Sequence, residues 1–159
     1  MADTVTDYFV FTDISDVVVL NPMQNVINLC PETIYVGMEV DQILQNEWFT
    51  EVYGKKRCIC DTITIHEYIT TFANKILINC GTICAHKTLS VEVLTKIINI
   101  MDLVYMTHGT ETLTPMPIDM FAWNYVVYKH YNDRIYDGDN FTTPFNKNIS
   151  DTTKCLKHK

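Results

Sequence analysis

The spacing of the apolar residues changes near residue 39, and this change restricts the folds that the chain can adopt. Upstream, four short runs rich in Val, Ile, Phe and Tyr are typical of β-strands; they span 7–11, 16–20, 26–29 and 33–36. Three residues separate the last two runs, so a hairpin is the simplest connection between them. These strands argue against an all-helical fold.

Downstream of residue 39 the apolar residues recur with the period of an amphipathic helix. The predicted helices are 39–53, 65–79, a segment that Ser90 caps, and a final segment from Pro117 to Asp133. Short extended segments are expected at 57–65 and 82–86. This order of elements predicts an α+β fold, in which a cluster of helices packs on a small β-sheet.

A chain of 159 residues is expected to form one domain, which we place at 1–136. Residues 137–159 are polar, and we expect them to form a loosely ordered tail. Within the domain, the helix that Ser90 caps has one apolar face that would pack on the sheet. The residues of this face are Val91, Leu94, Ile97, Ile98, Met101 and Tyr105.

The chain is acidic, with a formal net charge of −7, which disfavours nucleic acid or an anionic membrane as the partner. No segment approaches the roughly 20 apolar residues that a membrane-spanning helix needs. The N-terminus lacks the basic and apolar regions of a secretory signal, so we expect a cytoplasmic protein with reduced cysteines. Abundant Ile, Asn, Thr and Tyr are typical of an AT-rich source such as a large DNA virus; the compartment would then be the host cytosol.

The sequence lacks the local motifs of several enzyme classes. There is no G-x-G-x-x-G, no H-E-x-x-H and no C-x-x-C, and the five glycines form no phosphate-binding loop. No serine or cysteine stands on a recognisable nucleophile turn. We therefore expect a protein that is not an enzyme and has neither catalytic residues nor a cofactor.

Four of the six cysteines occur in two pairs, each with a histidine nearby. The candidate zinc ligands are Cys58, Cys60, Cys80, Cys84, His66 and His86. Zinc ligands usually come in C-x-x-C pairs, whereas these pairs are C-x-C and C-x-x-x-C. On a strand, Cys58 and Cys60 would stand about 7 Å apart, too far to chelate one ion comfortably. Core packing is the favoured role of these thiols, and a small zinc-binding protein remains an alternative.

Aromatic residues gather on the final predicted helix. Phe121, Tyr125 and Tyr128 lie along one helical stripe, which Trp123 and Tyr131 do not fully join. Large aromatic side chains are common both in protein cores and as anchors of protein–protein interfaces. The sequence leaves both roles open for this cluster.

Several segments between residues 32 and 106 follow a pattern of residue types found in one known family. In "ETIYVGMEVDQILQNEWFTEVYG" an extended segment precedes a helix with the aromatic pair Trp48-Phe49. "CICDTITIHEYITTFANKIL" follows as strand and helix, and in "INCGTICAHKTLSVEVLTKI" Cys80-Gly81 takes the place of a Thr-Gly pair. Upstream, Ser15-Asp16-Val17 is similar to the start of the family's first strand. In these features the chain resembles BTB/POZ domains, particularly the divergent ones of poxviral BTB and kelch-type proteins.

The resemblance implies a BTB/POZ-like fold and a non-enzymatic protein–protein interaction module. Such a module would be a viral adaptor or decoy for a cullin-type ubiquitin-ligase scaffold, and it would form a homodimer with Asp16 at the interface. The expected partner contacts are Trp48, Phe49, Phe121, Tyr125 and Tyr128. A further alternative is a viral host-interaction protein of the helical apoptosis-inhibitor type, since "INCGTICA" is similar to that family's groove motif.

Overall fold

The computed structural model describes residues 7–13, 15–47, 49–50, 65–108, 118–136, 141–144 and 152–158, with the backbone alone at 65, 66, 69 and 108. Its strands are β1 (Tyr8–Thr12), β2 (Val17–Val19), β3 (Ile34–Gln42), β4 (Ile76–His86), β5 (Ile135–Tyr136) and β6 (Leu156–His158). Its helices are α2 (Ile65–Phe72), α3 (Lys87–His108) and α4 (Ile118–His130), with the 3₁₀ turns η1 (Met23–Asn25) and η2 (Asn132–Arg134). The predicted α+β class is confirmed.

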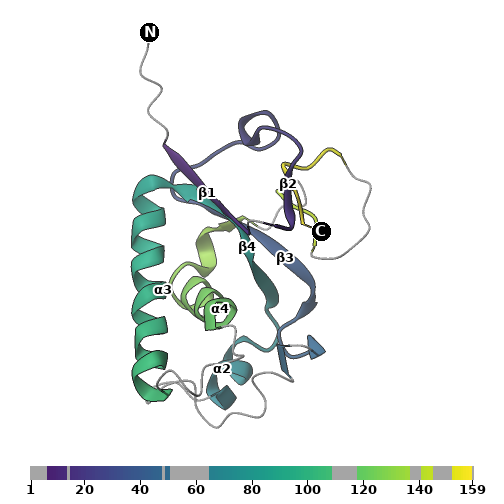
Figure 1. The fold of residues 1–159 in the computed structure, drawn as a ribbon. Coiled ribbons are helices and arrows are strands. Elements are labelled where there is room, and N and C mark those ends of the chain that lie inside the picture. Colours follow the sequence, from purple (N-terminus) through teal and green to yellow (C-terminus); the bar gives the residue numbers. More distant parts are fainter. Residues whose placement is uncertain are drawn as a thin grey trace.

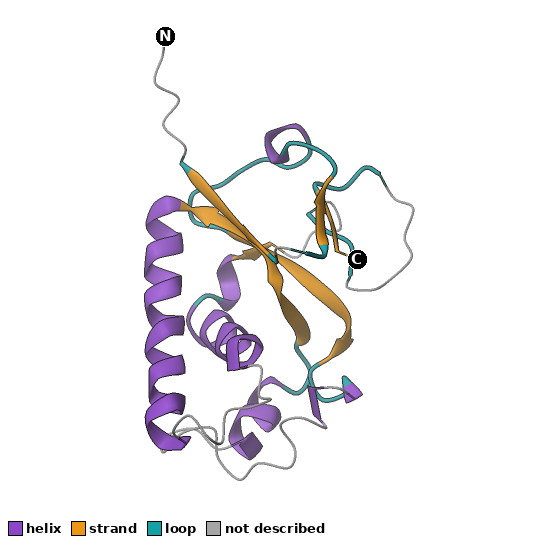
Figure 2. Cartoon of the chain, viewed as in Figure 1, coloured by secondary structure: helices purple, strands orange, loops and turns teal. Residues whose placement is uncertain are grey.

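The strands form a four-stranded sheet in the order β1-β4-β3-β5 and a separate antiparallel pair of β2 and β6 (Figure 1). Strand β4 is antiparallel to both β1 and β3, whereas the short β5 is parallel to β3. Helix α4 contacts both β4 and α3, and α3 runs along the outer side of α4 (Figure 2). The mixed sheet is incompatible with the all-helical fold of the apoptosis-inhibitor alternative. No helix in the described ranges is long and apolar enough to cross a membrane.

Two hydrophobic clusters lie on the two faces of the β3–β4 pair. Side chains of a strand alternate between faces, and accordingly Ile34 and Val36 join the cluster under the helices while Tyr35 joins the other. The second cluster is formed by Met23, Ile27, Tyr35, Cys84, Phe141, Cys155 and Leu156. The sheet is therefore covered on both faces, by helices on one and by irregular chain with β2 and β6 on the other.

The predicted helices 39–53 and 65–79 are wrong over part of their length. Strand β3 continues to Gln42, and the helical turn after it begins at Glu47, where Oδ1 of Asn46 accepts the amide hydrogen of Phe49 at 2.9 Å as an N-cap. Helix α2 ends at Phe72, and Ile76 and Leu77 already belong to β4. Isoleucine is compatible with a strand as well as with a helix. Residues 76–79 form a strand because they pair with β3.

One other predicted element is wrong, and one belongs to a longer strand than expected. Residues 26–29 are irregular chain after η1 and not a strand, so the predicted hairpin is replaced by pairing of β3 with β4. Strand 82–86 is the end of the longer β4. The predicted strand 57–65 lies almost entirely outside the described residues.

The sequence predicts that residues 137–159 form a loosely ordered tail. The parts of this segment that the structure describes pack on the rest of the fold. Phe141 and Cys155 are fully buried in the second cluster, and β6 pairs with β2. Nδ2 of Asn21 donates hydrogen bonds of 2.7 Å to the carbonyl oxygens of Thr152 and Lys154. A few apolar side chains and these hydrogen bonds thus dock a mostly polar segment on the sheet.

Candidate functional site

A β-bulge in β4 lies beside an indentation that several polar side chains line. Val36 is paired with Ile83 and the next residue, Gly37, with Asn79, which leaves residues 80–82 of β4 without a partner on β3. Bulges of this kind redirect side chains and are common beside functional sites. At Gly81 an added Cβ would lie 2.3 Å from Oδ2 of Asp13, so the missing side chain is what lets Asp13 approach β4.

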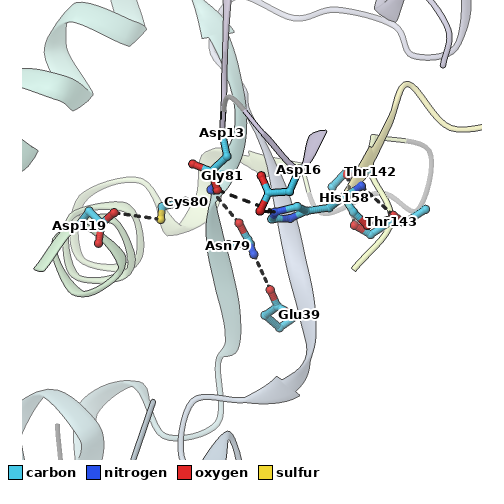
Figure 3. Close-up of polar contacts among 10 residues, drawn as sticks. All are labelled: Asp13, Asp16, Glu39, Asn79, Cys80, Gly81, Asp119, Thr142, Thr143 and His158. Atoms are coloured by element: carbon cyan, nitrogen blue, oxygen red, sulfur yellow. Dashed lines mark hydrogen bonds and ion pairs between the residues drawn. The ribbon is translucent and has the colours of Figure 1, made fainter. Parts of the chain in front are cut away.

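Asp13, Asp16 and His158 meet beside this bulge (Figure 3). Nε2 of His158 lies 3.6 Å from Oδ2 of Asp16 and 3.9 Å from Oδ2 of Asp13. The imidazole is only 2% exposed, whereas the carboxylates of Asp16 and Asp13 are 33% and 54% exposed. These three residues thus combine a buried ring nitrogen with two carboxylates that solvent reaches.

The secondary structure positions each of the three side chains. Asp13 directly follows β1, and its amide donates a hydrogen bond to the carbonyl of Gly81 at 3.0 Å. Asp16 directly precedes β2, where Val17 is paired with His158 of β6. The hydroxyl oxygen of Thr143 accepts the amide hydrogen of His158 at 3.0 Å, which fixes the backbone that carries the imidazole.

A cavity of about 420 Å³ opens beside the three side chains. Its wall consists of Asp13, Asp16, Glu39, Asn46, Leu77, Asn79, Cys80, Met120 and His158. Nδ2 of Asn79 donates to Oε1 of Glu39 at 2.6 Å, and Oδ1 of Asn79 accepts the amide hydrogen of Gly81 at 2.7 Å. The carboxylates of Asp13, Asp16 and Glu39 supply most of the polar groups of this otherwise largely apolar wall, and such acceptor oxygens suit a cationic or hydrogen-bond-donating ligand.

The structure does not bring Cys80 and Cys84 together. Cys84 belongs to the second cluster, and Cys80 packs on the helical side with Sγ 3.7 Å from Oδ2 of Asp119. Burial raises the pKa of both thiols to about 12, with the carboxylates of Asp119 and Asp13 adding to the effect at Cys80. Neutral thiols are poor nucleophiles and poor metal ligands.

The remaining candidate zinc ligands give no support to the cysteine site. Cys58 and Cys60 lie outside the described residues, as does the side chain of His66. His86 stands at the far end of β4 with its ring edge-on to Tyr8, 5.5 Å between centroids. Within the described ranges, the only three candidate ligand atoms that meet within 4.8 Å belong to Asp13, Asp16 and His158.

The aromatic residues expected to contact a partner lie in the core. Phe49 and Phe121 are fully buried, and Tyr125 and Tyr128 are 9% and 7% exposed. Tyr68 of α2 is in ring contact with Phe49 and Phe121, at centroid distances of 5.8 Å and 4.7 Å. Core packing, one of the two roles left open for the cluster on the final helix, is therefore the one observed, and Trp48 lies outside the described residues.

Helix α3 carries two apolar stripes, and only half of the residues predicted for the core face are exposed: Ile97 is buried, and Leu94 and Met101 pack partly against the core. Its buried residues are Leu89, Ser90, Val93, Ile97 and Val104. On the outer stripe Val91 is 63% exposed, Ile98 55% and Tyr105 51%, and half-buried Leu94 and Met101 lie between them. These five residues, which we call the α3 stripe, are spaced alternately three and four apart, as in the seam of a coiled coil.

Comparison of the chain with protein-family models found no match, and neither did comparisons with curated proteins and with solved structures.

Proposed function

We propose that this chain is a non-enzymatic protein–protein interaction module that binds its partner through the α3 stripe. The observation that carries this proposal is the exposure of Val91, Ile98 and Tyr105, which are more than half accessible. A helix with a single core contact needs one apolar stripe. In the second stripe of α3, Leu94 and Met101 still pack against the core, whereas the exposed Val91, Ile98 and Tyr105 belong to neither described cluster. Contiguous exposed apolar side chains of this kind mark interaction surfaces.

The spacing of the α3 stripe favours another helix as the partner. Alternate steps of three and four residues keep a seam facing a second helix, with each side chain inserted between residues of the opposite seam. From Val91 to Tyr105 the seam is about 21 Å long at 1.5 Å per residue. A second copy of this chain presents an identical seam, so we propose a two-fold symmetric homodimer.

The BTB/POZ resemblance predicts a dimer interface at Asp16. The interface that we propose lies instead on the α3 stripe. Asp16 lies beside His158 on the side of β2 and β6. The role of Asp16 at an interface stays a prediction of that resemblance. Both interfaces can be tested by charge substitutions in the same assay.

The BTB/POZ resemblance also supplies a class of heterologous partner, a cullin-type ubiquitin-ligase scaffold in the cytoplasm. This part of the proposal, a viral adaptor or decoy, rests on the resemblance alone. A pull-down from a host-cell extract tests the adaptor role. The purified wild-type chain is the bait, and the Ile98→Glu and Asn99→Glu variants are used in parallel. Recovery of a cullin by the wild type supports the adaptor role, and failure to recover one removes it without affecting the homodimer.

Cysteine cross-linking tests the homodimer directly. Ile98 is the middle residue of the α3 stripe, so it lies near its own copy in a two-fold pairing. We expect an Ile98→Cys variant to form a covalent dimer under mild oxidation. An Asn99→Cys variant, exposed but off the stripe, is the matched control for the native cysteines. Equal cross-linking of the two variants would contradict the proposal.

A further inference from the structure

We propose that Asp13, Asp16 and His158 bind a divalent first-row transition cation, independently of any partner at the α3 stripe. The proposal is based on the positions of the three donor atoms, which come from the β1–β2 connection and from β6 and lie within 4.8 Å of one another. The site differs from the cysteine-based zinc site considered from the sequence, because it contains one imidazole nitrogen and two carboxylate oxygens.

The separations of the donor atoms fit a shared ion better than direct hydrogen bonds. Nε2 of His158 is 3.6 Å and 3.9 Å from the two carboxylate oxygens, beyond the roughly 2.7–3.2 Å of an N–H···O bond. In a tetrahedral zinc site with ligand bonds of about 2.0–2.2 Å, ligand atoms stand roughly 3.3–3.6 Å apart. The side chain of Asp13 is 54% exposed, and a small movement of its carboxylate toward Nε2 of His158 would bring the three donor atoms to these separations.

The surroundings hold the donors in place. The amide of Asp13 is bonded to the carbonyl of Gly81, and the amide of His158 is bonded to Thr143. Oδ1 of Asp16 is buried and accepts no hydrogen bond from any described residue. A buried carboxylate oxygen is costly without a donor or a cation beside it. A bound cation would balance the charge of both carboxylates at the place where the ring of His158 brings a nitrogen ligand.

The donor set indicates which cation is suitable. Imidazole nitrogen favours Zn²⁺ and its first-row neighbours, whereas Ca²⁺ and Mg²⁺ prefer sites made of oxygen alone. Three protein ligands leave one position open, and here the cavity with Glu39 and Asn79 lies beside it. The cation would join the segment after β1 to β2 and β6, so its binding should stabilise the docked C-terminal strand.

Calorimetric titration of the full-length chain, after removal of metal with a chelator, tests the proposal with Zn²⁺ as the probe. We expect saturable binding of one ion that the Asp13→Asn/Asp16→Asn double variant loses and the Asp41→Asn control keeps. Both aspartates of the double variant are partly exposed, so it should fold, and far-UV circular dichroism verifies this. Saturable binding that is equal in the wild type and the double variant, or no saturable binding in the wild type, would overturn the site.

Substitution with Co²⁺ distinguishes this site from cysteine ligation. With nitrogen and oxygen donors we expect visible d–d bands and no thiolate-to-cobalt charge-transfer band. A charge-transfer band that persists in the double variant would assign the ion to cysteines and contradict the proposal. In the wild type, an increased melting temperature with Zn²⁺ that is absent from the double variant would support it.

Discussion

The side-chain amide of Asn124 binds both backbone groups of Ile78. Oδ1 of Asn124 accepts the amide hydrogen of Ile78 at 2.8 Å, and Nδ2 donates to the carbonyl of Ile78 at 2.8 Å. Asn124 is fully buried on α4 and Ile78 on β4, so one side chain gives the strand the hydrogen bonds that a neighbouring strand would give. This contact connects helix α4 to the sheet beside the bulge.

Replacing Asn124 with leucine should destabilise the fold strongly. The substitution keeps the volume approximately and leaves two buried backbone groups of Ile78 without these partners, at a cost of roughly 2–4 kcal/mol in the free energy of unfolding. Urea denaturation measures the loss, and Asn99→Leu on the exposed side of α3 is the control. A loss below about 0.5 kcal/mol in Asn124→Leu would show that the contact contributes little.

Gly81→Ala tests the close approach of Asp13 to the bulge. The new Cβ would lie 2.3 Å from Oδ2 and 2.8 Å from Cγ of Asp13, so we expect a destabilisation of about 1–3 kcal/mol. Because the obstruction is the carboxylate, Gly81→Ala in an Asp13→Ala background should cost much less. Denaturation of the four proteins forms a double-mutant cycle, and additive effects would contradict the predicted contact.

The residues that form this part of the molecule illustrate what the sequence could predict. Helix α4 begins where Pro117 and the apolar period place it, because a proline in the first turn and a regular stripe are local signals. The β3–β4 pair was not predictable in the same way. Ile76 and Leu77 continue the helical spacing of α2, and only pairing with β3 makes them part of a strand.

The candidate sites depended still more on tertiary structure. Asp13 and His158 lie near opposite ends of the chain, and no local motif connects them; the β2–β6 pairing brings them together. On α3 the sequence showed the apolar residues but not which of two adjacent stripes faces the sheet. The alternation of three and four residues was visible, and it would have indicated a seam if the buried stripe at Leu89 and Val93 had been recognised.

Truncating Leu156 tests whether the C-terminal segment belongs to the folded domain. Leu156 is 2% exposed in the second cluster, so Leu156→Ala should lower the free energy of unfolding by about 2–5 kcal/mol. Lys157→Ala, on the same strand but half-buried, should cost less than about 1 kcal/mol. A dispensable tail would instead show equal and small losses for both variants in urea denaturation.

The thiol of Cys84 should make the protein less stable at alkaline pH. Burial, with the neighbouring Cys155 thiol, raises the pKa of Cys84 from an ordinary value of 9.0 to about 12 in the folded chain. Its contribution is fully present below about pH 9 and is lost as the pH rises toward 12, because the unfolded thiol ionises first.

Stability measured at pH 8 and near pH 11 checks this dependence. We expect wild type to lose more free energy of unfolding between the two values than a Cys84→Ala variant, whose stability at pH 8 is lower from the start. An identical loss in the two proteins would show that Cys84 makes no such contribution.

The central claim, that the α3 stripe is an interface between two copies of this chain, is tested most directly by light scattering coupled to size-exclusion chromatography. Wild type should elute with twice the chain mass of 18.4 kDa and dissociate on dilution. Ile98→Glu should elute as a monomer with an unchanged circular dichroism spectrum, and Asn99→Glu should remain a dimer. A monomeric wild type at every concentration, or an Ile98→Glu variant that stays dimeric, would contradict the account.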